Sequence, residues 1–349
     1  GFLFTASPKW LGVPPPNTQS LLPSLGLQGT GWLLWLIGAV WSNRLAWTGM
    51  LLATAGLLAM YTLFWRMVRR SDADDRLHAK IVSIAGGVGI CVLLGAQSAL
   101  WLGQTDLALL AIRTGLWGFV VTTYVTVAHR MLPFFTSSAL PMIAPWGPMW
   151  VLWFLLGVAS LEALAAWAPL LLDPGAWQGA RTPRAWMLAL GLIELATGSV
   201  VLWLALTWGL VQSLKFRLLA MLHAGFTWLG VALVLSGASQ LLGLRQGVPV
   251  LGLGALHALT MGFMGSVLLA MVTRVSCGHS GRSLVADNLI WTLFGLLQVA
   301  TVLRIASALE HATTWLTLSA ASSWLVIMVL WGSRLSKWYG QPRQDGKPG

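Results

Sequence analysis

The sequence of 349 residues is 57% hydrophobic and 9% charged, which excludes an ordinary soluble domain, because such domains carry charge on about a quarter of their residues. Its formal net charge of +11 does not indicate nucleic-acid binding, since the basic residues gather into no patch of the size of a groove. The two cysteines exclude a disulfide framework, and the 22 tryptophans are typical of a chain with many helix ends at a membrane surface.

The chain is predicted to form transmembrane helices, because apolar runs of about 20 residues recur along it and each can cross the hydrocarbon core. GFLFTAS (1–7) is expected to be the end of a helix that starts upstream. About ten complete runs follow, near residues 22–42, 45–66, 81–103, 106–128, 149–172, 185–210, 217–243, 250–273, 287–309 and 312–334. Proline-rich segments at 12–20 and 138–148 predict breaks between helices. We therefore expect an all-α polytopic membrane helix bundle that forms one domain over residues 1–349.

Lysine and arginine residues are shared unevenly between the two sides of the predicted bundle. Fifteen fall on the side of the C-terminus and four on the other, while Arg113 and Arg304 lie within apolar runs. Cytoplasmic loops are enriched in Lys and Arg, so the side of the C-terminus is predicted to be cytoplasmic. The fifteen are Lys9, Arg66, Arg69, Arg70, Arg76, Lys80, Arg130, Lys215, Arg217, Arg274, Arg282, Arg334, Lys337, Arg343 and Lys347, and the four are Arg44, Arg181, Arg184 and Arg245.

Five ionisable residues are predicted at similar depths in the outer half of the membrane. A rise of about 1.5 Å per residue places His257, Arg113, Glu194, Glu162 and Arg304 between about 8 and 15 Å deep. Ionisable groups inside a membrane are costly, and they are usually paired and functional. We expect either a functional layer of proton-carrying or ion-paired groups, or arginine–glutamate pairs that only hold helices together. Arg304 is alternatively expected to reach the membrane surface along its flexible stem.

His257 begins a stripe of methionines on one helix face. Met261 and Met264 follow it at i+4 and i+7, and Met271 lies further along the same face. Thioether sulfur beside an imidazole suits Cu(I), so His257 and Met261 are candidate metal ligands. In the alternative interpretation the methionines fill the core and His257 is a hydrogen-bonded structural histidine.

Three more histidines are predicted near the cytoplasmic side. His223 lies six residues into its helix, His129 is expected to close a helix, and His279 is expected in a glycine-containing turn. Imidazole is the commonest protein metal ligand and a frequent axial ligand of haem, so all three are candidate cofactor ligands. Alternatively they are interfacial residues that bond lipid headgroups or helix-end carbonyls. His78 and His311 are expected to be solvated, and no role is proposed for either.

Four segments resemble successive signature blocks of the NnrS family, whose members are polytopic membrane proteins linked to nitric oxide metabolism and reported to carry haem and copper. The segments are GFLFTASPKW (1–10), HRMLPFFT (129–136), LHAGFTWLGVAL (222–233) and HALTMGFMGSVLLAMVTRVSCGHSGR (257–282). They occur in the family's order, and the resemblance extends over the whole chain. The resemblance implies haem and copper as cofactors, and it places His129, His223, His257 and His279 at family histidine positions or within matching motifs.

The sequence also departs from the family pattern. The family turn usually has Leu where this chain has Cys277, and the family block often has Gly where this chain has His129. The family has a His-x-His-Glu-Met block just upstream of the first segment, and this chain starts after that block, which would fall level with His257. Because His257 and His279 are about 30 Å apart along one straight helix, we expect two sites. One lies around His257, and the other lies around His223 with His279 or His129 nearby.

The resemblance implies a haem- and copper-binding protein of a bacterial inner membrane that acts in the response to nitric oxide and protects against nitrosative stress. Its expected partners are the lipid bilayer, nitric oxide as a ligand, and an electron donor that the sequence does not identify. Catalysis stays open, because Glu162 and Glu194 can carry protons but no electron-entry domain is visible. Two alternatives also stay open: a secondary transporter that uses Arg113 and the two glutamates, although no internal repeat is visible, and a non-catalytic subunit of a larger membrane complex.

Overall fold

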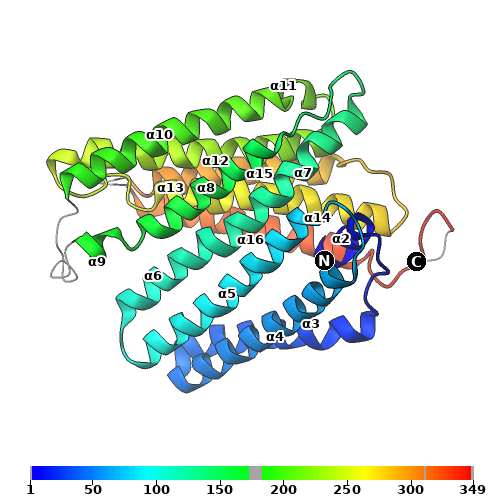
Figure 1. The fold of residues 1–349 in the computed structure, drawn as a ribbon, viewed down its shortest axis with the longest axis horizontal. Helices are drawn as coiled ribbons and strands as arrows, with labels where there is room; N and C mark the ends of the chain where they lie inside the picture. Colours follow the sequence, from blue (N-terminus) through cyan, green and yellow to red (C-terminus); the bar gives the residue numbers. More distant parts are fainter. Residues whose placement is uncertain (1, 173–182, 310–311, 347–349) are drawn as a thin grey trace. The chain divides into compact units, whose positions relative to one another are not determined.

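The computed structural model describes residues 2–172, 183–309 and 312–346, and these residues form helices and loops without any strand (Figure 1). In chain order the helices are α1 (Phe2–Thr5), α2 (Ser7–Leu11), α3 (Thr18–Trp41), α4 (Asn43–Arg70), α5 (Leu77–Trp101), α6 (Thr105–Gly115), the π-helix η1 (Leu116–Val121), α7 (Thr122–Ala139), α8 (Met149–Ala165), α9 (Ala168–Leu172), α10 (Arg184–Thr207), α11 (Leu210–Ser213), α12 (Arg217–Leu242), the 3₁₀-helix η3 (Gly243–Arg245), α13 (Gly254–His257), the π-helix η4 (Ala258–Gly265), α14 (Ser266–His279), α15 (Asn288–Ala306) and α16 (Thr314–Ser336).

The chain divides into two compact units. Unit 1 comprises residues 1–130 and 147–178, and unit 2 comprises residues 131–146 and 179–349. Helix α7 begins in unit 1 and ends in unit 2. This division does not test whether the chain forms one membrane domain, which stays a prediction.

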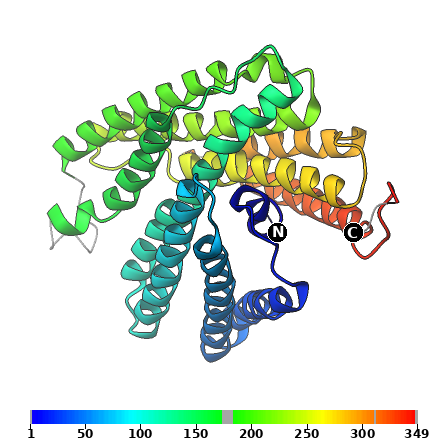
Figure 2. The ribbon, with the colours of Figure 1, turned by 45° about the vertical axis from the view of Figure 1, so that its right-hand side comes forward.

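In unit 1, α3 and α4 lie side by side as a helical hairpin, seen in blue in Figures 1 and 2. Glycines line the contact: a Cβ at Gly49 would lie 2.6 Å from the carbonyl oxygen of Gly31, and one at Gly56 would lie 2.7 Å from the amide nitrogen of Gln28. Small residues let the backbones of membrane helices approach closely, so this pair is held by direct backbone packing. One residue, Ser42, joins the two helices.

An aromatic core joins α4 to α5 and to η1 within unit 1. Tyr61 packs edge-on against both Phe64 and Phe119, with ring centroids 6.3 and 5.7 Å apart. A Cβ at Gly89 of α5 would lie 2.6 Å from Cγ of Phe119, so this ring occupies the space that the glycine leaves. The core therefore fixes α5 against the segment that leads into α7.

In unit 2, α10 and α12 run antiparallel and pack through glycines. A Cβ at Gly198 would lie 2.9 Å from the carbonyl oxygen of Gly230, and a Cβ at Gly237 would lie 2.6 Å from that of Gly191. Polar side chains tie α12 to its other neighbours. Trp228 Nε1 donates a hydrogen bond to Gln298 (2.7 Å), whose amide donates to Ser266 Oγ (3.0 Å).

Eight helical runs among the described residues are long and apolar enough to cross a membrane, and they confirm the predicted all-α polytopic fold. They are Asn43–Arg70, Leu77–Trp101, Thr105–Ala139, Arg184–Thr207, Arg217–Arg245, Gly254–His279, Asn288–Ala306 and Thr314–Ser336. Two predicted spans differ from this set. Helix α3 covers the first predicted run but is rich in Gln, Ser, Thr and Gly and is not among the eight, and the run predicted at 149–172 is split into α8 and α9.

Two of the spans contain a π-helix that the sequence did not predict. Helix η1 separates α6 from α7, and η4 separates α13 from α14. A π-turn widens the helix by one residue, and both the backbone N–H and the Oγ1 of Thr122 donate to the carbonyl of Trp117 five residues earlier, the latter at 2.9 Å. Such segments occur frequently at functional sites.

Helix α7 also continues beyond the predicted end. His129 was expected to close the helix, but α7 extends ten residues further, to Ala139, with Pro133 inside it. Proline is tolerated within membrane helices where neighbouring groups satisfy the freed backbone. The prediction that His129 closes a helix was therefore wrong, and His129 lies within α7.

Candidate functional site

A pair of buried histidines lies in unit 1, at the start of α5. His78 is 6% exposed and His129 is 4% exposed. Their rings stack with centroids 5.3 Å apart, and His78 Nε2 lies 3.0 Å from His129 Nδ1. His129 Nε2 lies 3.1 Å from the carbonyl oxygen of Pro148, the residue that precedes α8. The pair thus connects α5, α7 and the start of α8.

The carbonyl of Pro148 determines where the protons of this pair lie. A carbonyl oxygen only accepts hydrogen bonds, so His129 Nε2 carries a proton and donates it. In the neutral ring Nδ1 is then an acceptor, and it receives the proton of His78 Nε2. His78 Nδ1 is left as an acceptor, 3.8 Å from the carboxylate of Asp75. Both ring nitrogens of His129 are therefore occupied by hydrogen bonds, which leaves this histidine less suited to bind a metal.

Asp75 forms the exposed edge of the histidine pair. Its second carboxylate oxygen accepts a hydrogen bond from Arg130 at 2.5 Å, and the Arg130 guanidinium lies 4.9 Å from the ring centroid of Trp10. Burial acts to raise the pKa of Asp75, but the hydrogen bond and charge of Arg130, together with His78, outweigh it and hold the pKa below its usual value.

The prediction that His78 is solvated was wrong. The charged residues around it suggested an exposed loop, but His78 begins the buried face of α5, one residue into the helix. The spacing of Asp75 and His78, three residues apart across a helix start, was the one signal in the sequence that the two side chains lie together. His311 lies outside the described residues.

In unit 2, His223 is a fully buried histidine with one open ring nitrogen. Thr136 Oγ1 donates its proton to the carbonyl of Leu132 (2.8 Å), so it accepts a hydrogen bond from His223 Nε2 (2.8 Å). His223 Nδ1 is buried and has no hydrogen-bond partner among the residues that the structure describes. A buried polar atom without a partner is costly, and it is suited to a ligand that the coordinates do not contain.

His257, the last residue of α13, lies directly before the π-helix η4. It is half-buried, and its Nε2 is shielded from solvent without a hydrogen-bond partner in the described part of the chain. The guanidinium of Arg304 on α15 is close enough to interact electrostatically with this ring. Met261 lies one π-turn further along and is also half-buried, whereas Met264 and Met271 belong to the buried core.

His279 is the last residue of α14 rather than part of a turn, and its side chain is exposed. Arg343 donates a hydrogen bond to its backbone carbonyl (3.3 Å). His257 and His279 therefore lie at opposite ends of one helical run, Gly254–His279, as the sequence predicted.

The ionisable layer is divided between the units: Arg113 and Glu162 belong to unit 1, and Glu194 and Arg304 belong to unit 2. Arg113 is exposed and makes no ion pair with the described residues, and Glu162 is half-buried. Glu194 is 1% exposed and accepts a hydrogen bond from Ser236 Oγ at 2.8 Å. Arg304 donates to Ser307 Oγ at 2.7 Å. Pairing of these groups across the layer stays a prediction.

No group of three or more His, Cys, Asp or Glu side chains among the described residues is arranged to hold a metal ion. A copper ion bound only by protein usually takes three or more ligands. Haem iron needs only one or two axial side chains, because the macrocycle supplies the others. His223 and His257 each offer one imidazole nitrogen without a partner in the described part of the chain, and a single such donor does not by itself define a metal or haem site.

Comparison with known proteins gives one match. The family model described as NnrS protein matches residues 1–343, nearly the whole chain. No curated protein and no solved structure matches the sequence.

Proposed function

The chain belongs to the NnrS family, which is linked to the nitric oxide response, and we propose that it is a haem-binding membrane protein that binds nitric oxide. Its multiple apolar helices make it a multi-pass membrane protein. The observation that carries the proposal is the buried, unpartnered Nδ1 of His223.

His223 would bind the haem iron through Nδ1. Its Nε2 donates to Thr136, and this hydrogen bond fixes the ring orientation and keeps the lone pair on Nδ1. A histidine ligand usually donates its other ring nitrogen to such a partner, which raises the basicity of the ligating atom. Bound haem iron supplies an open coordination position at which nitric oxide can bind. His223 is fully buried, which excludes water from this nitrogen.

His257 is the proposed second cofactor ligand, through Nε2, with Met261, four residues on, as the candidate soft donor. Copper at this point would need donors beyond the groups that the described residues assemble, so we propose copper only as a weakly held ion. The bacterial inner membrane, a cytoplasmic C-terminus and protection against nitrosative stress are proposed from the family resemblance together with the excess of basic residues on one side.

The test is a visible absorption spectrum of detergent-purified protein from cells supplied with haem precursor. We expect a Soret band that shifts on adding nitric oxide. His223→Ala is expected to lose most of the bound haem, and His223→Gln, which retains a hydrogen-bond donor for Thr136, is expected to lose haem while keeping the melting temperature within a few degrees. His279→Ala serves as the control, because its side chain is exposed, and it should keep the band.

Absence of a Soret band in fully folded wild-type protein would overturn haem binding and favour the transporter or the subunit function. A Soret band that survives in both His223 variants would overturn the assignment of His223 but not the binding of haem. His257→Ala then reports on the second site: we expect it to lower metal content and to leave the component held by His223 unchanged.

A further inference from the structure

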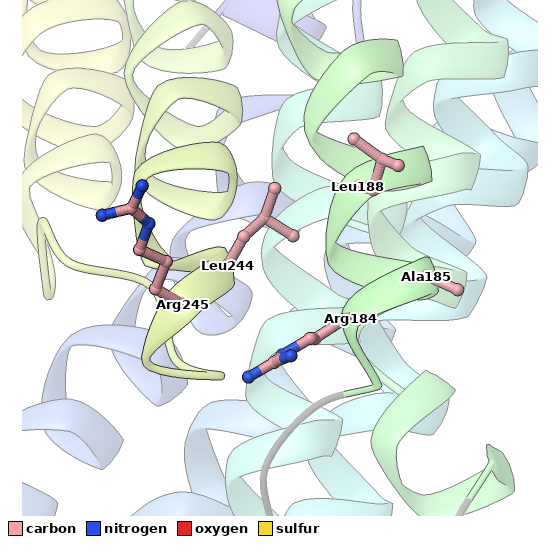
Figure 3. Close-up of a pocket in the computed structure, with 5 residues that line it drawn as sticks. All are labelled: Arg184, Ala185, Leu188, Leu244 and Arg245. Carbon is pink, nitrogen blue, oxygen red and sulfur yellow. The ribbon is translucent and has the colours of Figure 1, made fainter.

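A cavity of about 430 Å³ lies in unit 2 between the first turns of α10 and the end of α12 with η3. Its lining residues are Arg184, Ala185, Leu188, Leu244 and Arg245. Figure 3 shows Leu188 and Leu244 facing the space between the two helices and Arg184 extending toward the segment that carries Leu244 and Arg245, whereas Arg245 points to the opposite side of that segment from Leu244. The cavity therefore combines an apolar floor with two cationic side chains.

Both arginines are available to an external anion. Arg184 and Arg245 are exposed, and neither makes a hydrogen bond, ion pair or ring contact with any residue that the structure describes. Other arginines of unit 2 differ: Arg217 donates to Asn288 Oδ1 and Arg343 to Asp345. The exposed side chain of Arg245 can rotate toward the cavity beside Arg184, and an anion with several oxygens then binds both guanidinium groups at once.

The position of the cavity selects the kind of anion. Arg184 is the first residue of one membrane-spanning run and Arg245 is the last residue of another, Arg217–Arg245. The close packing of α10 on α12 brings these two ends together on the same side of the helix pair. The ends of membrane-spanning helices lie at the level of lipid headgroups, so the anion that is concentrated there is a phospholipid phosphate.

An apolar track leads from the cavity along α10. Leu188 is 46% exposed and Leu192, four residues on and thus on the same helix face, is 52% exposed. Leu242 of α12 is 67% exposed beside the other wall. A free phosphate ion would make no use of these leucines, whereas an acyl chain would cover them.

We propose that this cavity binds one anionic phospholipid, with its phosphate between Arg184 and Arg245 and an acyl chain along Leu188 and Leu192. Because the lipid contacts both helices, it fastens the start of α10 to the end of α12. A zwitterionic lipid binds more weakly, since its positive headgroup is repelled by the two guanidinium groups. The proposal does not depend on haem or nitric oxide.

The test is native mass spectrometry of the delipidated full chain in detergent, titrated with phosphatidylglycerol or with phosphatidylcholine of identical acyl chains. We expect one phosphatidylglycerol to bind more tightly than any phosphatidylcholine. Each basic residue near an anionic lipid contributes a factor of roughly five in affinity, so Arg184→Gln with Arg245→Gln should weaken this first binding event by roughly 25-fold. The matched control is Arg44→Gln with Arg70→Gln, which removes the same charge from two exposed and unpaired positions of α4 and should leave that event unchanged.

Two further measurements distinguish a bound phospholipid from a free phosphate ion. One is competition by inorganic phosphate, and the other is the Leu188→Asn variant. Phosphate at millimolar concentration is expected not to displace the lipid, and Leu188→Asn is expected to weaken lipid binding with both arginines intact. Displacement by phosphate with no effect of Leu188→Asn would show a site for a free anion and would overturn the proposal. Equal losses of lipid in the cavity variant and in the α4 control would also overturn it, because binding would then follow net charge alone.

Discussion

The contributions of His78 and His129 to stability depend on each other, because His78 Nε2 donates a hydrogen bond to His129 Nδ1 and both residues are buried. Replacing His78 by Ala removes the donor to His129 Nδ1 and leaves a buried acceptor unsatisfied, so we expect a loss of about 1–3 kcal/mol in unfolding free energy. Replacing both histidines by Ala should cost less than the sum of His78→Ala and His129→Ala, with a coupling of about 0.5–3 kcal/mol.

This coupling is measured by a double-mutant cycle from unfolding curves in mild detergent. Lys80→Ala is the control, because Lys80 is an exposed residue of the same helix, and it should change stability by less than about 0.5 kcal/mol. Strictly additive losses for His78 and His129 would contradict the hydrogen-bonded pair.

Asp75 is expected to make the unfolding free energy of unit 1 depend on pH. The folded chain holds the pKa of Asp75 below its ordinary value, because Arg130 and His78 outweigh the effect of burial. A carboxyl group with a lowered pKa stabilises the fold above its unfolded pKa and loses this contribution as pH falls through the folded value. Asp75→Asn should therefore lower stability at pH 7, and this difference should shrink as the pH falls through the folded pKa of Asp75, where the carboxyl becomes neutral like the amide.

The effect of Asp75 should be at most about 1 kcal/mol, because the side chain is more than half exposed. Melting temperatures measured between pH 3 and pH 7 check the expectation. Asp72→Asn removes an exposed carboxylate of the same loop and is the matched control. A constant difference between wild type and Asp75→Asn over the whole range would contradict it.

At the scale of helices, the glycine contacts between α10 and α12 predict that an added methyl group there destabilises the packing. A Cβ at Gly198 would meet the backbone oxygen of Gly230 at 2.9 Å, and backbone cannot move aside as a flexible side chain can. Gly198→Ala should therefore destabilise unit 2 by about 1–3 kcal/mol. Gly295→Ala in α15 meets nothing within 4 Å and should be neutral or stabilising by up to about 1 kcal/mol. Thermal unfolding of both variants tests this, and equal melting temperatures would show that the helices are not in backbone contact.

The positions of most helices could be predicted from the sequence, because long apolar runs with charged ends leave few alternatives. The predicted run 217–243 corresponds to Arg217–Leu242, and 312–334 corresponds to Thr314–Ser336. The π-helices could not be predicted, because runs that are apolar on every face carry no periodicity from which a widened turn can be recognised. The continuation of α7 beyond Pro133 depends on tertiary packing and not on local preference.

The candidate site was predictable only in part. His223 was expected six residues into a helix, and it holds that position in α12, fully buried. His78 was missed because its neighbours in sequence are charged, although its partners in space are His129 and Asp75. Contacts between segments far apart in sequence decide which histidines pair. A hydrophobic pattern does not predict these contacts.

For the molecule as a whole, the excess of basic residues on one side predicts its orientation in the membrane. Ser71 is a poor position for a label, because it is buried and donates a hydrogen bond to Leu11 O at 2.6 Å. Asp72→Cys and Ser336→Cys are exposed positions and should be made in a background with Cys91→Ala and Cys277→Ala. Both labels are expected to react with an impermeant reagent only after cells are permeabilised, and reaction in intact cells would invert the orientation.

The α3–α4 hairpin has a consequence for how the chain is made. Helix α3 is too polar to count among the eight apolar runs, and it meets α4 through glycines across a connection of one residue. A segment of marginal hydropathy partitions poorly into lipid when it leaves the translocon alone. We expect α3 to stay at the translocon until α4 has been synthesised, so that the two helices enter the bilayer together. A longer linker after Ser42 should then leave α3 outside the membrane.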